Sequence, residues 1–270
     1  MPCEPVSATL PVVSVKADPE DAFLRRLQIL RDRIRNAAGY PFCIPALASL
    51  DILEFHPRVT YIVGENGTGK STLLEGIAVA AGFNPEGGSP NFQFSTRSSE
   101  SELHHAIRLV RSSRRPRTGF FLRAESFFNL ATNIEELDRT PALAPPIINS
   151  YGRRSLHEQS HGESFIALMT HRFGPGGLYI LDEPEAALSP LRQLSMLVRL
   201  HELVQAGSQF IIATHAPILL SYPEAWIYEL SEMGIKRTPY EATETVRVTR
   251  NFLEDPDAVL RELFGRGSGG

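Results

Sequence analysis

The residues best suited to chemistry stand in one glycine-rich stretch. Directly after the apolar run 59–63, residues 64–72 read Gly-Glu-Asn-Gly-Thr-Gly-Lys-Ser-Thr. Its glycines let successive backbone N–H groups turn toward one anion, and the helix that follows adds its positive N-terminal end. We therefore expect the stretch to bind the phosphates of a nucleoside triphosphate. The residues expected to contact the nucleotide are Gly64, Glu65, Asn66, Gly67, Thr68, Gly69, Lys70, Ser71 and Thr72.

Two side chains of this phosphate loop have expected tasks of their own. Lys70 is placed to reach the β- and γ-phosphates. The hydroxyl of Ser71 is placed to bind Mg²⁺, which bridges the same phosphates. The loop thus predicts a metal-assisted reaction or switch at a triphosphate.

A second pair of reactive side chains ends another apolar strand, where residues 178–184 read Leu-Tyr-Ile-Leu-Asp-Glu-Pro. Successive side chains of a strand point to opposite faces, so the two carboxylates are expected to differ in task. Asp182 would hold Mg²⁺, and Glu183 would face the γ-phosphate as general base for the attacking water. An isolated Asp-Glu pair is as often a solvated strand end, but its combination with the phosphate loop favours the functional interpretation.

A third segment, Ser160-His161-Gly162-Glu163-Ser164, precedes an apolar helix. An N-cap hydroxyl, free backbone N–H groups and the helix dipole together form an anion site. Taken alone the segment is a helix cap. Its place shortly before the carboxylate strand favours a contact with the nucleotide.

Together these segments resemble the ABC-type ATPases, a family that includes chromosome-maintenance and double-strand-break-repair ATPases as well as transporter motors. In that family a Ser-Gly-Gly-Gln-like signature lies ahead of the Asp-Glu strand. Ser160, Gly162 and Glu163 match its Ser, second Gly and Gln, whereas His161 replaces the first Gly. The resemblance implies ATP as the nucleotide and Mg²⁺ as its metal. It also implies an ATP-dependent homodimer, in which the signature loop of one copy closes on the γ-phosphate held by the other.

Smaller matches extend the resemblance over about residues 40–230. Segment 186–190 corresponds to the family's dimer-contacting loop, and His215 corresponds to its switch histidine at the γ-phosphate. The family's lid glutamine has no obvious equivalent, because Glu125 and Ser126 follow the predicted strand 120–124. The candidates for the aromatic residue that stacks on adenine in transporter motors are Tyr40, Phe42 and Phe55, although a position in the core is favoured for each.

The length of the segment before the signature bears on the branch of the family. Repair and chromosome ATPases insert long coiled coils there, whereas this chain has only residues 127–159, interrupted by prolines. The short arm favours a stand-alone ATPase related to the repair and phage-defence groups. A transporter motor and an ATP-controlled binding switch with incidental turnover are the alternatives, and a phosphate-loop kinase would not explain the signature or His215. The sequence does not show whether the chain works with a separate permease or nuclease partner.

One basic stretch raises the possibility of nucleic-acid binding. Residues 108–123 contain six arginines and two phenylalanines, a composition suited to a phosphate backbone. The formal net charge of -4 gives no general attraction to nucleic acid, so a solvated basic turn is slightly favoured. The arginines expected to carry any such contact are Arg111, Arg114, Arg115 and Arg117.

Composition sets the remaining expectations. With 270 residues, 42% of them apolar, the chain suffices for one elaborated domain at 20–270, after an extended leader at 1–19 and with a short inserted arm at 127–160. No apolar run approaches the roughly 20 residues that cross a bilayer, so a cytoplasmic location is expected. Cys3 and Cys43 lack metal-ligand spacing and are expected to be reduced.

Periodicity predicts strands that alternate with helices, and hence an α/β three-layer sandwich with a mostly parallel core sheet. An antiparallel N-terminal subdomain and a short helical arm complete the expected architecture. Helices are predicted at 20–38, 71–81, 102–110, 163–171, 190–205 and 255–264. Strands are predicted at 42–44, 52–55, 59–63, 120–124, 178–181, 210–213, 226–230 and 245–249.

Overall fold

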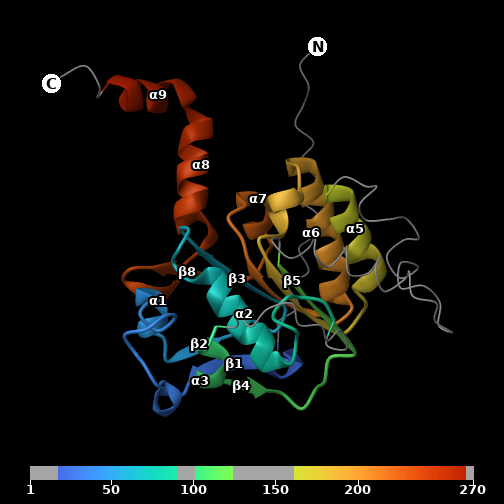
Figure 1. The fold of residues 1–270 in the computed structure, drawn as a ribbon. Coiled ribbons are helices and arrows are strands. Elements are labelled where there is room, and N and C mark those ends of the chain that lie inside the picture. The colour runs from blue at the N-terminus through green and yellow to red at the C-terminus, as the bar shows by residue number, and fades with distance from the viewer. Residues whose placement is uncertain (1–17, 90–100, 124–160, 266–270) are drawn as a thin grey trace, which may run out of the picture.

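The structure, a computed structural model, describes residues 18–89, 101–123 and 161–265 (Figure 1). The expected leader up to residue 17 lies outside the described residues. So do the expected arm, Ser160, Glu125 and Ser126.

A six-stranded sheet forms the centre, in the order β5-β6-β7-β3-β8-β9. All neighbours run parallel except β8 and β9, which form an antiparallel pair. The strands are β3 (Val59–Gly64), β5 (Thr118–Arg123), β6 (Gly177–Asp182), β7 (Gln209–Ala213), β8 (Trp226–Ser231) and β9 (Gly234–Arg237). Because β3, β6 and β7 are adjacent and parallel, the residues that follow them meet at one edge of the sheet.

Helices cover both faces of this sheet (Figure 1). Consecutive strand residues point to opposite faces, so Tyr61 and Ile62 belong to two different buried clusters. The Tyr61 side is covered by α5 (His161–Arg172), α6 (Pro190–Gln205) and α7 (Pro217–Leu220). The Ile62 side is covered by α2 (Lys70–Ala81). These layers confirm the predicted three-layer sandwich.

A second, antiparallel sheet packs on the outer side of α2, as predicted for the N-terminal subdomain. It has the order β2-β1-β4, with β1 at Leu24–Ile29, β2 at Ile52–Glu54 and β4 at Ile107–Arg111. Two short helices, α1 (Pro45–Ala48) and α3 (Leu103–Ala106), accompany it. At Gly76 of α2 an added Cβ would lie 2.9 Å from Ile107 Cδ1, so a glycine allows this close packing.

The predicted helix at 20–38 is wrong. Residues 24–29 form β1, flanked by 3-10 turns at Pro19–Asp21 and Arg31–Arg33. The backbone of β1 pairs with β2 and β4, and the buried amide of Gln209 takes hydrogen bonds from the N–H groups of Phe23 and Leu24, both at 2.9 Å. Tertiary pairing therefore overrides the helical spacing of the apolar residues.

Three smaller predictions also fail. The helix predicted at 102–110 ends after residue 106, where the chain becomes β4. Residues 42–44, predicted as a strand, form a turn that leads into α1. The expected strand at 245–249 lies inside α8 (Glu244–Glu254), which continues into α9 (Pro256–Gly265). A strand would place Val246 and Val248 on the same face, but in α8 Val246 is buried and Val248 is exposed. A short alternation of apolar and polar residues therefore does not distinguish a strand from a helix here. Two further 3-10 turns lie at Pro184–Ala187 and Tyr240–Ala242. No helix in the described ranges is both long and apolar enough to span a membrane.

Candidate nucleotide-binding site

The phosphate loop connects β3 to α2 at the edge where the parallel strands end. Gly64, Gly67 and Gly69 all have positive φ angles, of 145°, 85° and 97°. A Cβ atom at Gly64 would collide with the carbonyl oxygen of Leu230 in β8. The loop conformation therefore requires these glycines, and it leads directly into the N-terminus of α2.

Lys70 is a buried cation without a carboxylate partner in the described part of the chain. Its side chain is 4% exposed, and its Nζ donates to the carbonyl oxygens of Gly64 at 2.9 Å and Glu65 at 3.0 Å. Burial lowers the pKa of Lys70, and the nearby Glu183 and Asp182 oppose that shift. A desolvated ammonium bound to neutral carbonyls inside a glycine loop fits an incoming anion such as a phosphate.

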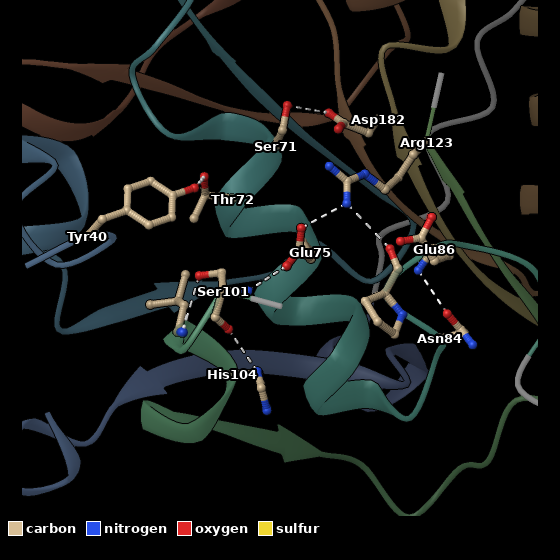
Figure 2. A network of polar contacts seen from close by, with 12 residues as sticks. Tyr40, Ser71, Thr72, Glu75, Asn84, Glu86, Ser101, His104, Arg123 and Asp182 are labelled. Atoms are coloured by element: carbon tan, nitrogen blue, oxygen red, sulfur yellow. Dashed lines mark hydrogen bonds and ion pairs between the residues drawn. The ribbon is translucent and has the colours of Figure 1, made fainter. Parts of the chain in front are cut away.

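Ser71 and Asp182 meet across the sheet edge, although they are far apart in sequence (Figure 2). The Ser71 hydroxyl donates to Oδ1 of Asp182 at 3.2 Å. Burial raises the pKa of Asp182 to about 6, against the effect of Ser71 and Arg123. A serine hydroxyl and a carboxylate are hard oxygen ligands of the kind that Mg²⁺ prefers. Within the described ranges, no group of three or more His, Cys, Asp or Glu side chains could hold a metal ion.

Glu183 and His215 approach each other at the ends of β6 and β7. Glu183 adopts the left-handed conformation, with φ 49° and ψ 52°, and its N–H donates to the carbonyl of Ala213 at 2.9 Å. Its Oε1 lies 3.5 Å from Nε2 of His215, an approach within ion-pair distance but without a hydrogen bond. A non-glycine residue in this conformation is strained, and such strain often occurs at functional sites.

A network that the sequence did not predict joins α2 to the neighbouring elements (Figure 2). Glu75 Oε2 accepts from Arg123 at 2.9 Å, and Glu75 Oε1 accepts from the N–H of Ser101 at 3.0 Å. Arg123 is the register partner of Asp182 between β5 and β6. The sequence offered one signal for this network. Glu75 stands four residues after Ser71, so the two side chains lie on the same side of α2.

The three aromatic candidates for adenine stacking differ in exposure. Phe42 and Phe55 are buried in the core, whereas Tyr40 is 65% exposed. The Tyr40 hydroxyl lies 2.9 Å from Oγ1 of Thr72, within hydrogen-bond distance, and Figure 2 shows its ring beside the start of α2. Tyr40 is therefore the candidate that presents its ring near the phosphate loop.

The described part of the signature segment opens α5. Gly162 is buried and Glu163 is exposed. Glu163 forms an ion pair with Arg192 of α6 at 3.1 Å, just beyond the expected dimer-contacting segment 186–190. Both helices lie on the sheet face opposite α2.

Two hollows border the phosphate loop on its β8 side. One, of about 260 Å³, is lined by Gly64, Glu65 and His215 and by Thr245 and Val248 of α8. The other, of about 750 Å³, is lined by residues 65–68 and by Lys236 and Arg247. Both hollows thus lie directly beside residues of the phosphate loop.

The basic stretch lies at the opposite end of the sheet, before β5. Arg111 donates to the carbonyl groups of Ala80 and Ala81 at the end of α2. Arg114 forms an ion pair with Asp21 at 3.3 Å. Arg115 and Arg117 are exposed. Two of the four arginines thus have structural partners, and the stretch is remote from the phosphate loop.

A glycine loop after a buried parallel strand, a buried lysine and a serine–aspartate pair define the class of P-loop nucleotide-binding proteins. Residues 33–135 match the family model of an AAA domain. An energy-coupling factor transporter ATP-binding protein of Methanospirillum hungatei is 27% identical over 247 residues, covering 83% of this chain and 59% of the relative. An ABC transporter G family member of Medicago truncatula is 28% identical over 184 residues, covering 62% of this chain and 25% of the relative.

The chain thus spans 59% and 25% of the length of these two relatives. Among solved structures, the SMC head domain from Thermotoga maritima aligns with a TM-score of 0.41 and 16% identity, covering 80% of this chain and 98% of that one. The family model, the two relatives and the motifs at the site support a similarity of this chain to ABC-type P-loop ATPases.

Proposed function

We propose that the chain, folded as one domain over residues 20–270, binds ATP with Mg²⁺ and hydrolyses it between two copies. The observation that carries the proposal is the 3.5 Å approach of Glu183 to His215, next to the Ser71–Asp182 pair. A base, a metal site and a phosphate loop meet at one edge of the sheet. A protein that only binds nucleotide would not need the base.

The residues divide the work as follows. Lys70 and the loop N–H groups would bind the β- and γ-phosphates, and Ser71 and Asp182 would hold Mg²⁺. Mg²⁺ held there would neutralise part of the negative charge of the phosphates. Glu183 orients the attacking water and accepts its proton, and His215 contacts the γ-phosphate from the adjacent strand end. Water attack breaks the bond to the γ-phosphate, so the products are ADP and phosphate.

The second copy supplies the missing side of the site. Ser160, Gly162 and Glu163 are assigned to the γ-phosphate of the partner chain, and ATP then holds the two copies together. Two observations support this proposal: the signature helix α5 lies on the face opposite α2, and the phosphate loop borders open hollows.

Glu183→Gln tests the assignment of the base. The variant should keep ATP affinity, lose at least about 100-fold in turnover, and accumulate as an ATP-bound dimer in sedimentation. Lys70→Ala is the matched control and should lose both binding and the dimer. Retained turnover in Glu183→Gln would falsify the role of Glu183.

The alternative of a binding switch makes a different prediction for the same variant. A switch should stay locked in its active, partner-bound form when Glu183→Gln blocks turnover. A chain whose turnover drives a cycle should lose its output. Partner capture with ATP, compared between the wild type and Glu183→Gln, separates the two.

For the biological client we propose a stand-alone ATPase linked to DNA repair or defence, supported by the short segment before α5. The second candidate is the motor subunit of a transporter, which the names of the two sequence relatives favour. For the repair or defence candidate, binding to DNA and RNA should be detectable when it is measured over a range of salt concentrations with and without ATP. Arg115→Ala/Arg117→Ala should weaken it, because these arginines are exposed. Co-purification with a membrane permease and no effect of nucleic acid would favour the second.

A further inference from the structure

His215 is held through its backbone by a side chain that the function above does not use. Glu185 lies in the 3-10 turn Pro184–Ala187, two residues after Glu183. Its Oε1 accepts a hydrogen bond from the backbone N–H of His215. One loop therefore carries both the expected base and the group that anchors the histidine.

The other side of the same peptide is fixed as well. The hydroxyl of Thr245, at the start of α8, donates to the carbonyl oxygen of His215 at 3.0 Å. Two side chains from two different elements therefore hold the backbone of His215. With the backbone held, the ring places Nε2 3.5 Å from the Glu183 carboxylate.

This arrangement is costly for a purely structural contact. The second carboxylate oxygen of Glu185 is buried and has no hydrogen-bond partner among the described residues, and the same holds for the hydroxyl of Tyr61. Burial raises the pKa of Tyr61, with Tyr222 and Glu185 adding to the effect. A buried carboxylate oxygen without a partner costs free energy, so the contact between Glu185 and His215 is maintained at a cost in stability.

We propose that Glu185 is a positioning residue that aligns His215 with Glu183 and the γ-phosphate. Glu185 acts through the backbone of His215, whose N–H group it accepts from. The inference rests on the proposed role of His215 and adds that its placement is set by the loop after β6. Movement of that loop then moves base and histidine together.

Paired substitutions at Glu185 test this inference by steady-state ATP hydrolysis. Glu185→Ala removes the acceptor and should lower kcat about 30-fold, with KM and ATP affinity within about threefold of wild type. Glu185→Gln keeps an acceptor oxygen for the His215 N–H and should remain within about threefold of wild-type kcat. Equal losses in both variants would overturn the proposal, because the hydrogen bond would then not be the cause.

A double-mutant cycle with His215→Ala separates positioning from general stability. In the His215→Ala background, Glu185→Ala should lower kcat less than about threefold further, since the ring that it positions is gone. A full additional 30-fold loss contradicts the inference. If Glu185→Ala does not fold, Thr245→Val takes its place in the cycle, with an expected kcat loss of about tenfold and an unchanged KM. In that case, an unchanged kcat in Thr245→Val contradicts the proposed positioning of His215.

Different results would contradict the proposed function rather than the positioning role of Glu185. A wild type without ATP hydrolysis, or a His215→Ala variant with full turnover, contradicts the proposed function itself. If His215→Ala loses turnover as expected but Glu185→Ala keeps the turnover of the wild type, only the positioning role of Glu185 is contradicted.

Discussion

Arg123, the last residue of β5, forms a 2.9 Å ion pair with Glu75 in the middle of α2, and both side chains are mostly buried, at 22% and 10% exposure. Arg123 is also the register partner of Asp182. This ion pair thus connects α2, the helix after the phosphate loop, to β5, the strand that pairs with β6 beside Asp182.

Breaking this pair from one side should be costly. Arg123→Met leaves the Glu75 carboxylate buried without its cation, and we expect a loss of about 3 kcal/mol in unfolding free energy. Glu75→Gln/Arg123→Met should lose less than the single variant, because glutamine still accepts from Ser101 without a buried charge. Urea denaturation measures both. Arg114→Met, in the exposed pair with Asp21, is the control and should cost under about 1 kcal/mol. A larger loss in the double variant than in Arg123→Met contradicts the prediction.

Asp182 should make the nucleotide-free protein less stable at neutral pH. Its folded pKa of about 6 lies above the ordinary 3.8, so folding favours the protonated form. Stability should therefore fall as pH rises from 4 to 6, by up to about 3 kcal/mol. Asp182→Asn resembles the protonated form and should be more stable than wild type at pH 7, with no difference below pH 4. Its affinity for Mg²⁺-ATP should nevertheless drop. Denaturation with EDTA at several pH values measures the first effect, and a pH-independent difference contradicts it.

His56 should have the opposite pH dependence. Burial lowers its pKa from 6.5 to about 4, and its Nδ1 accepts from the N–H groups of Arg58 and Val59, as a neutral ring can. The stabilisation is present above pH 6.5 and is lost as pH falls toward 4, by about 3 kcal/mol. His56→Asn keeps a comparable acceptor and cannot be protonated there, so it should be less sensitive to acid than wild type. Because this effect opposes that of Asp182 between pH 4 and 6, the two partly cancel in the wild type. Parallel acid sensitivity in His56→Asn and wild type would count against the assignment.

Tyr40 should contribute the base-stacking surface for adenine. Stacking of a base on an aromatic ring is worth about 1–3 kcal/mol, so Tyr40→Ala should weaken ATP binding about tenfold. Tyr40→Phe keeps the ring and loses only the contact with Thr72, so its affinity should stay within about threefold of wild type. Fluorescent-nucleotide titration measures both. Equal weakening in the two variants would assign the effect to the Thr72 contact rather than to the ring.

The parallel core was readable from the sequence because its strands are buried on both faces. The segments around Val59–Gly64, Gly177–Asp182 and Gln209–Ala213 are short continuous apolar runs that end in glycine or polar residues, so their type and place were predicted. The glycines of the phosphate loop were equally readable, since their positive φ angles follow from a local motif.

The β1 region shows where local pattern fails. Leu24, Leu27 and Ile29 have a spacing that a helix would also bury, and only the backbone pairing of β1 with β2 and β4 decides for a strand. The α8 region shows the reverse error. Partners distant in sequence decide such cases, and a single sequence does not show which segments will pair.

For this protein the sequence by itself determined the phosphate loop, the carboxylate strand and the α/β class, because each depends on residue types within one short segment. Only the tertiary structure decided that Ser71 binds Asp182, that Arg123 pairs with Glu75 and that Glu185 holds the backbone of His215. Each of these contacts joins separate strands or helices. Their distances depend on the order and register of the sheet, which no local pattern encodes.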